Sequence, residues 1–244
     1  MAVLKEKTVS EAVAYRRSVR VFTPEPLDDE RVKSCLELAA LAPTSSNLQL
    51  WEFYHVTDSE KKKDIAAACF NQSAAKTAQQ LVVVVARRDL WRKRAQANLQ
   101  FLSKAFENAE NFDSKRQKMV MNYYGKLIPT LYSTFLGIKG WLVYLFAQVV
   151  GLFRPMYRQT RKSDLRIVAH KSAGLAAQNF MISMAGIGYD TCPMEGHDSL
   201  KVKKVLGLGR GSEINMVIGC GKRDDKGIYG ARFRVPFEEV YRKV

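Results

Sequence analysis

Residues 81–86 read Leu-Val-Val-Val-Val-Ala, a run in which no side chain is polar. The length and β-branched composition of this run predict a strand, and a strand that is apolar on both faces lies centrally in a sheet. Residues 51–56 (WEFYHV) and 213–219 (EINMVIG) also have the composition of strands. We therefore expect a sheet in which residues 81–86 are a central strand.

Helices are predicted on both sides of these strands. Apolar residues recur at helical spacing in 8–17 and 28–42, and the charged segment 89–126 predicts one long exposed helix or two. In residues 167–186 small and apolar residues recur at helical spacing, which predicts a helix packed all round at the centre of the core. No repeat or flexible linker divides the sequence, so we expect one domain over residues 1–244 with an insertion at about 89–165.

The charge of the chain limits its partners. Lys plus Arg number 39 against 24 Asp plus Glu in 244 residues, a net charge of +15. Such a surface favours phosphorylated cofactors, acidic lipid or nucleic acid, and basicity alone does not select nucleic acid, which we do not expect. The four cysteines are widely spaced and the three histidines are dispersed, so no metal site is expected. The charged N-terminus does not fit a signal peptide, and we expect a cytoplasmic protein.

The most apolar stretch of the chain is residues 127–153, with basic residues on both sides. Lys139 interrupts it, and the charge-free piece 140–153 is shorter than the ~20 residues of a spanning helix. A buried or an interfacial helix is expected instead. Basic clusters beside apolar residues also allow contact with an anionic membrane surface through 127–153, so a location peripheral to the membrane stays open.

Two polar segments lie between the predicted elements. The first places three guanidinium groups and a hydroxyl within five residues, a set that can surround a phosphate or can simply be a solvated helix end; it comprises Arg16, Arg17, Ser18 and Arg20. The second, APTSSNLQLW at 42–51, offers hydroxyls and amides that suit the edges of a planar heterocycle, unless it is an ordinary turn; these are Ser45, Ser46, Asn47 and Gln49.

Several common chemistries have no motif in this sequence. There is no GxSxG nucleophile elbow, no HExxH zinc motif, no GxxxxGK[ST] phosphate loop and no GxGxxG after a strand. Hydrolysis by a catalytic triad or a metal is therefore not expected.

The remaining motifs, in their order along the chain, resemble the nitroreductase family of FMN-dependent oxidoreductases. RRSVRVF at 16–22 is similar to the family's RRSxR phosphate motif, and APTSSNLQLWEF to its PSSxNxQPW flavin loop. FNQ at 70–72 stands where the family has a ring-contacting Asn. DTCPMEGHD at 190–198 is similar to its P-[IM]-E-G-[FH]-D turn, and RFR at 232–234 to its C-terminal basic pair. The resemblance covers most of 9–90 and 165–240.

The resemblance implies an α+β fold, with a central, mostly antiparallel sheet flanked by helices, in an intertwined homodimer. It implies that the phosphate and ribityl end of FMN is held by Arg16, Ser18, Arg20, Arg232 and Arg234, with Arg17 either contacting the phosphate or exposed. Against the ring it implies Ser45, Ser46, Asn47 and Gln49, partly from the partner subunit, and Asn71 at the ring edge. The turn of Pro193, Met194, Glu195 and Gly196 would cover the ring and aim backbone N–H at N5, with Glu195 acting through its backbone.

The implied activity is hydride transfer from NADH or NADPH through flavin N5 to an acceptor such as a nitroaromatic or a quinone, with no dedicated catalytic acid. Alternatives are other redox chemistry on the same flavin fold, such as dehalogenation or ene reduction, and a low-turnover flavin-binding protein at a membrane surface.

Four features need interpretation beside the resemblance. Leu50 stands where the family often has Pro, and Cys192 is expected to be a small buried filler rather than a redox thiol. His197 and Asp198 are expected to organise the turn. Aromatic residues of the insertion are candidates either for a lid or for core and dimer interface; they are Trp91, Phe101, Tyr123, Tyr124, Trp141 and Tyr144.

Overall fold

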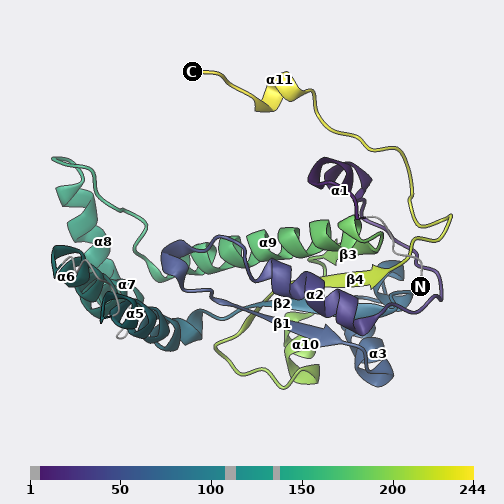
Figure 1. Cartoon of the computed structure of the whole chain (residues 1–244), viewed down its shortest axis with the longest axis horizontal. Coiled ribbons are helices and arrows are strands. Elements are labelled where there is room, and N and C mark those ends of the chain that lie inside the picture. The colour runs from purple at the N-terminus through teal and green to yellow at the C-terminus, as the bar shows by residue number, and fades with distance from the viewer. Residues whose placement is uncertain (1–5, 108–113, 134–137) are drawn as a thin grey trace.

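The fold is built on one antiparallel sheet of four strands. The computed structural model describes residues 6–107, 114–133 and 138–244, and places the strands in the order β1-β2-β4-β3 (Figure 1). These are β1 (Trp51–Val56), β2 (Gln80–Ala86), β3 (Asp190–Met194) and β4 (Glu213–Gly221). The three strands expected from the sequence are confirmed, and β2 is central and buried along its whole length.

Strand β3 was not among the expected strands, because the segment 190–198 was interpreted as a turn. Pro193 lacks the N–H that a central strand must donate, and proline is tolerated at a sheet edge. β3 is the edge strand, paired with β4 through Asp190↔Gly221 to Met194↔Val217. The turn itself begins only after Met194.

Two layers of helices cover the two faces of the sheet. Because side chains alternate along a strand, Val82 and Val84 face α2 and α9, whereas Leu81, Val83 and Val85 face the other layer. The first layer consists of α2 (Asp29–Ala39) and α9 (Lys162–Gly186), and the second of α3 (Ser59–Ala68), α4 (Ser73–Lys76) and α10 (Ser199–Val205). The α+β fold expected from the sequence is therefore confirmed.

Helix α9 is the central helix of the structure. It begins at Lys162, earlier than the predicted 167, and its alanines Ala169, Ala173, Ala176 and Ala177 are buried against the sheet. Small side chains allow the helix backbone to approach its neighbours closely, and Phe180 fills the remaining space with no exposed surface. The prediction of a helix in the centre of the core is confirmed, but the prediction that it is packed all round is wrong for this chain, because Ile167 and Leu175 are each 49% exposed.

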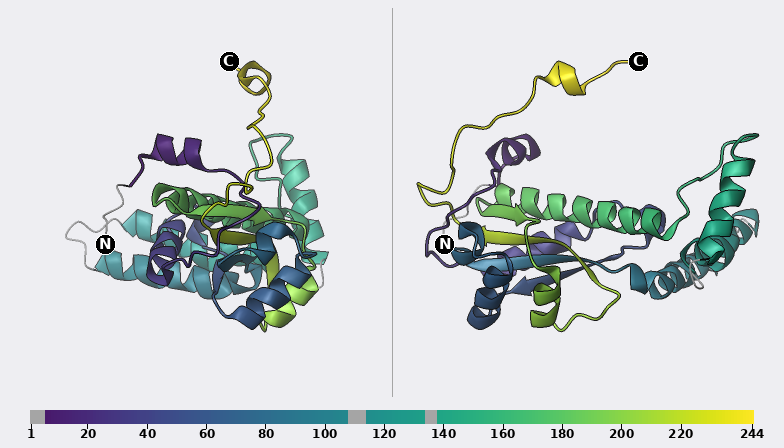
Figure 2. Two further views of the ribbon diagram at one scale, coloured as in Figure 1. Left: turned by 90° about the vertical axis from the view of Figure 1, so that its right-hand side faces the viewer. Right: turned by 180° about the vertical axis from the view of Figure 1, so that it is seen from behind.

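The segment after β2 extends away from one end of the sheet, as the views in Figure 2 show. It contains η2 (Arg88–Leu90), α5 (Trp91–Glu107), α6 (Ser114–Asn122), the π-helix η3 (Tyr123–Leu127), α7 (Ile128–Tyr132) and α8 (Ile138–Val150). The apolar stretch 127–153 is thus divided between helices. Its residues 134–137 lie outside the described residues, as do residues 108–113 of the predicted insertion. Among the described helices, none has the length and apolar content needed to cross a membrane.

Helix α1 (Val9–Tyr15) lies over α9, and the C-terminal tail leaves the body at the opposite end of the sheet from the insertion (Figure 1). The helix starts with a capping box between Thr8 and Glu11 and packs on α9. After β4 the chain runs away from the body as an extended tail with one short helix, α11 (Phe237–Val240) (Figure 1). Phe233 and Phe237 in this tail are 78% and 65% exposed. Exposed apolar side chains of this size often mark a surface that contacts another molecule.

Candidate functional site

The arginine motif after α1 lies along the free edge of the sheet. Ser18 forms a parallel bridge with Thr191 of β3, and the backbone N–H of Val19 donates to the Thr191 carbonyl over 3.1 Å. The N–H of Arg20 donates to the carbonyl of Gly227 over 2.7 Å. The motif is therefore held by backbone hydrogen bonds on both sides.

The start of the C-terminal tail reaches the same place. Arg232 donates to the carbonyl oxygens of Ala14 and Arg16 over 2.8 and 2.6 Å, and Arg17 donates to the carbonyl of Gly230 over 2.7 Å. Burial, with the positive charges of Arg232 and Arg234 next, lowers the pKa of Arg16. Segments more than two hundred residues apart thus place like charges together.

No acidic partner is found for these guanidinium groups in the part of the chain that the structure describes. The ion pairs found within the described ranges include none that involves the cluster of Arg16, Arg17, Arg20, Arg232 and Arg234. We call these five residues the arginine cluster. Mutually repelling cations without a counter-ion are stabilised when an anion binds among them, and guanidinium groups suit phosphate oxygens in particular.

A nearby carboxylate is engaged elsewhere. Asp190, 3% exposed at the start of β3, accepts hydrogen bonds from the backbone N–H and the Nε of Arg223 over 2.9 and 3.0 Å. Burial and the charge of Asp190 raise the pKa of Tyr15, whose ring lies 4.0 Å from the guanidinium carbon of Arg223. Asp190 and Arg223 therefore neutralise each other beside the arginine cluster, an arrangement that the sequence analysis did not identify.

The turn after β3 offers its backbone rather than its side chains. Met194 is 2% exposed and packs in the core, so that only its main chain is available, while Glu195 and Gly196 are exposed. The carbonyl of Gly196 accepts a hydrogen bond from Gln72 Nε2 over 2.7 Å. Asn71, adjacent to Gln72, is exposed and has a left-handed φ of 52°. The structure thus brings the predicted segments 70–72 and 193–196 together.

The end of this turn is organised by Asp198, as expected. Its carboxylate caps α10 by accepting from the N–H groups of Leu200 and Lys201 over 3.0 and 3.2 Å. His197 is half-buried, and this burial lowers the pKa of its ring. The Nδ1 atom of His197 is buried without a hydrogen-bond partner in the part of the chain that the structure describes.

The polar loop 45–49 is backbone-strained and is anchored by two leucines. Ser46, Asn47 and Gln49 have φ values of 54°, 49° and 48°, a left-handed conformation that is costly for residues other than glycine. Leu48 and Leu50, on either side of Gln49, bury their side chains and are 0% and 3% exposed. The buried anchors leave the polar side chains of the loop facing outward. In the described chain, the left-handed non-glycine residues all fall in this loop or at 70–71.

Helices of the insertion hold this loop. Asn98 of α5 is 8% exposed; its Nδ2 donates to the carbonyl of Asn47 over 2.8 Å, and its Oδ1 accepts from Asn47 Nδ2 over 2.7 Å. The hydroxyls of Tyr123 and Tyr124 contact Ser46 Oγ and the Ser46 carbonyl over 2.7 and 3.0 Å. The lid candidates Tyr123 and Tyr124 therefore support the loop, whereas Trp91 packs on Tyr132.

An apolar cavity of about 460 Å³ opens beside the same loop. Ser45 and Ser46 form its polar side, and the rest is lined mainly by apolar and aromatic side chains of η3, α7, α8 and α9, including Leu131, Tyr132 and Phe146. A cavity of this size and lining suits a flat apolar molecule with one polar edge.

The predicted residues fall into two groups at opposite ends of α9. Loop 45–49 shares the cavity with Leu165 and Val168 at the beginning of α9, whereas the segment before α1 bonds to Gly186 at its end. At 1.5 Å per residue, Leu165 and Gly186 are separated by roughly 30 Å. One chain therefore does not bring loop 45–49 to the arginine cluster.

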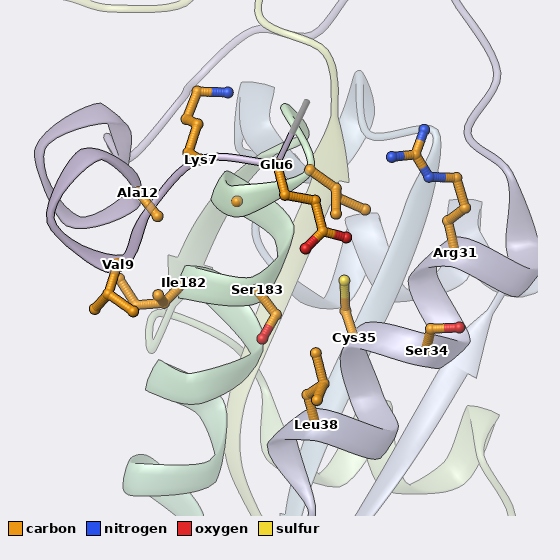
Figure 3. Close-up of a pocket in the computed structure, with 12 residues that line it drawn as sticks. Glu6, Lys7, Val9, Ala12, Arg31, Ser34, Cys35, Leu38, Ile182 and Ser183 are labelled. Carbon is orange, nitrogen blue, oxygen red and sulfur yellow. The ribbon is translucent and has the colours of Figure 1, made fainter. Parts of the chain in front are cut away.

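A second hollow, of about 370 Å³, lies between α1, α2 and α9. Cys35, Leu38 and Ser183 project into it from α2 and α9 (Figure 3). On its rim Val9 and Leu38 are 75% and 52% exposed. Burial raises the pKa of the Cys35 thiol to about 11, so this thiol is protonated at neutral pH. The hollow is lined by apolar side chains together with the charged Glu6, Lys7 and Arg31, and its thiol is not reactive.

The sequence model of the nitroreductase family matches residues 13–222, most of the chain. This chain belongs to the nitroreductase family. Protein DrgA of Synechocystis is 28% identical over 216 residues, 88% of this chain and 84% of DrgA. YdgI of Bacillus subtilis, which is named as an NAD(P)H nitroreductase, is 23% identical over 240 residues, 97% of this chain and 98% of that protein.

A solved structure from Exiguobacterium sibiricum, described as a nitroreductase in complex with FMN, is similar in fold. It has a TM-score of 0.67 at 22% identity and covers 98% of both chains. The nitroreductase fold expected from the sequence is thereby confirmed.

In this nitroreductase-family chain, the residues that depart from the motif or could have been reactive are buried in the core. Leu50, in place of proline, is part of the core between loop 45–49 and β1. Cys192 is fully buried, and burial raises the pKa of its thiol, as expected for a small filler. All four cysteines are buried and unpaired. In the described ranges, no group of three or more His, Cys, Asp or Glu residues could hold a metal ion.

Proposed function

We propose that this chain is an FMN-dependent oxidoreductase that transfers hydride from NADPH or NADH to an oxidised small-molecule acceptor. The observation that carries the proposal is the arginine cluster: guanidinium groups from both ends of the chain without a carboxylate partner in the described ranges, which fits a dianionic phosphate. When bound, FMN supplies reversible hydride acceptance, for which no protein side chain is suited.

The phosphate end would be held by the arginine cluster and Ser18. Arg17 uses one N–H for the Gly230 carbonyl and keeps others for an anion, since a guanidinium carries five donors. Arg16 is half-buried, so its hydrogen bonds to a phosphate would be partly shielded from water and correspondingly strong. The backbone ladder between Ser18 and Thr191 keeps these donors in position.

The ring would lie against the turn Pro193–Gly196, with Asn71 at its edge. Burial of Met194 and Cys192 fixes the backbone before the turn, and Gln72 fixes its carbonyl at Gly196. The N–H groups of this turn are thereby held in place to donate to a ring nitrogen, and Glu195 contributes through its backbone while its side chain stays in solvent. The residues present therefore fit a flavin mononucleotide.

The acceptor would bind beside loop 45–49. The apolar cavity there is lined by aromatic and aliphatic side chains with the Ser45–Ser46 edge as its polar border. This lining favours a nitroaromatic or a quinone over a small charged acceptor. The insertion at about 89–165 supplies most of the cavity lining and would therefore select the acceptor.

Two chains would complete each site. The arginine cluster and loop 45–49 lie at opposite ends of α9, so a two-fold partner has to supply the second half. The exposed Val9, Leu38 and Phe233, together with the hollow in Figure 3, offer apolar area for such a contact. We propose an intertwined homodimer in which the extended tail lies on the partner.

A mixed dimer tests this arrangement. One chain carries Arg16→Ala and the other Asn47→Ala, each with its own affinity tag, and the doubly tagged dimer is isolated. If the site is shared, one of its two sites has both changes and the other none, so about one FMN is bound per dimer with about half the wild-type oxidation rate of NADPH.

The controls are doubly tagged dimers in which both chains carry Arg16→Ala or both carry Asn47→Ala, and each should bind little FMN. If the mixed dimer behaves like these controls, each site is complete within one chain and the shared arrangement is wrong. If wild-type protein binds no FMN at all, the proposed function itself fails.

A further inference from the structure

The helix α8 and the turn that follows it expose a continuous apolar face. Exposed fractions are 59% for Trp141, 61% for Leu142, 59% for Phe146, 76% for Leu152 and 85% for Phe153. Leu145 and Val149 continue the same face at 47% and 58%. Positions 141, 145 and 149 and positions 142, 146 and 149 repeat at helical spacing, so these side chains form one face of the helix rather than scattered exposure.

The surroundings of this face are basic. Residues 114–162 contain nine lysines and arginines and no aspartate or glutamate. Lys118, Lys126, Arg154 and Lys162 are exposed on the segments around α8, and Arg161 stacks on Tyr144 with its guanidinium carbon 5.0 Å from the ring. An apolar helix face with aromatic residues and a basic border is the arrangement of helices that lie in the headgroup region of a bilayer.

Within the described chain this face of α8 is exposed. The helices α5 to α8 lie beyond one end of the sheet, away from the hollow between α1, α2 and α9 (Figures 1 and 2). α8 has 13 residues, about 20 Å of helix, which is too short to cross a bilayer of ~30 Å but long enough to lie flat on it.

We propose that α8 and residues 151–153 dock this protein onto the surface of an anionic phospholipid bilayer. The apolar face enters the boundary between headgroups and acyl chains, and the surrounding lysines and arginines contact lipid phosphates. A second copy of the chain fits this face less well, because a two-fold contact through α8 would bring two strongly basic segments together. Phe146 belongs both to this face and to the apolar cavity, so docking places the cavity wall at the lipid boundary.

Vesicle flotation of the full-length protein tests the proposal without any reductant, and its outcome is therefore independent of the oxidoreductase activity. The protein should float with vesicles of phosphatidylcholine containing phosphatidylglycerol at low salt, and much less with pure phosphatidylcholine or at high salt. Absence of the wild-type protein from the anionic vesicle fraction would overturn the proposal.

Matched substitutions separate the apolar and the charged contributions. Leu152→Ser should weaken vesicle binding roughly tenfold, while Leu200→Ser on α10, with the same 76% exposure, should leave it unchanged. Arg154→Gln should weaken it about fivefold, and Arg210→Gln should not. Equal losses in both members of a pair would show nonspecific adsorption and contradict a docking face at α8.

Trp141 reports the contact directly. Its fluorescence should be quenched by lipids brominated near the headgroup, and the quenching should disappear in Trp141→Phe, because Trp51 is only 5% exposed and Trp91 packs on Tyr132. If instead Leu152→Ser dissociates dimers in sedimentation experiments and Trp141 is not quenched, the face is covered by a second copy and the membrane proposal is wrong.

Discussion

The two halves of the proposed site are held by different means. The arginine cluster and the turn after β3 are attached to the sheet by backbone hydrogen bonds, such as Val19 to Thr191. Loop 45–49 is instead held by side chains of the insertion, through Asn98, Tyr123 and Tyr124. Backbone ladders tolerate most substitutions, whereas a contact between two particular side chains is lost with either residue. Substitutions in the first half should therefore leave its backbone conformation unchanged and affect binding mainly through lost charge. Substitutions in the second half should change the conformation of loop 45–49.

The largest effect is expected from removing charge in the first half. Arg16→Ala should weaken FMN binding about 100-fold, because hydrogen bonds to charged groups contribute up to about 3 kcal/mol. Fluorescence titration of the cofactor-free protein measures this, with the exposed Arg210→Ala as control. The thermal midpoint of the cofactor-free protein should not fall, since Arg16 is repelled by Arg232 and Arg234. Unchanged FMN affinity would refute the assignment of the cluster to phosphate.

Substitutions in the second half should lower the free energy of unfolding. Asn98→Ala removes the paired hydrogen bonds to Asn47 and the bond to the Arg94 carbonyl over 2.9 Å, and leaves a strained loop unsupported. We expect a loss of about 2 kcal/mol in the free energy of unfolding, measured by urea denaturation. Gln96→Ala, an exposed site on the same helix, should cost little. Equal unfolding midpoints for the two variants would mean that the insertion does not support the loop.

A smaller change in the same half tests a single contact. Tyr124→Phe removes only the hydroxyl that donates to the Ser46 carbonyl over 3.0 Å. The expected loss is about 1 kcal/mol in the free energy of unfolding, since one neutral hydrogen bond is removed and the ring remains. Tyr144→Phe on α8 is the control with the same chemistry outside the loop. A larger loss in Tyr144→Phe would place the support of the loop elsewhere.

The smallest effect on cofactor binding is expected from Cys192→Ala. The thiol lies beneath the first half, is fully buried, and has a pKa raised by burial, so it remains protonated and unreactive. FMN affinity should change less than about twofold, because the backbone of β3 and not the sulfur positions the turn. Loss of the flavin in this variant, with the fold intact by circular dichroism, would give the thiol a role that burial argues against.

Local pattern predicted much of this molecule. The run 81–86 predicts a central strand because a strand buried on both faces is apolar at every position, and the apolar spacing in 28–42 predicts the helix that the structure shows as α2, capped by Asp28. The family motifs identified the segments of the proposed site, and the family model confirms the family. The roles of the individual site residues stay predictions that the experiments above test.

Other features depended on contacts between distant segments. β3 was missed because Pro193 argues against a strand unless the strand is known to lie at an edge, and Asn98 was missed because nothing in a charged helix marks the one polar residue that turns inward. The same holds for Asp190, whose partner Arg223 lies on a segment 33 residues later.

The sequence by itself determined the central strand, the helices at 9–15, 29–39 and 162–186, and the identity of the segments that resemble a flavin site, because these depend on side-chain types at short spacing. Only the tertiary structure decided that Arg16 and Arg232 meet without a carboxylate partner in the described ranges, and that loop 45–49 lies at the other end of α9. The reason is physical: charge and periodicity are local properties, whereas which surfaces meet is set by the packing of the whole core.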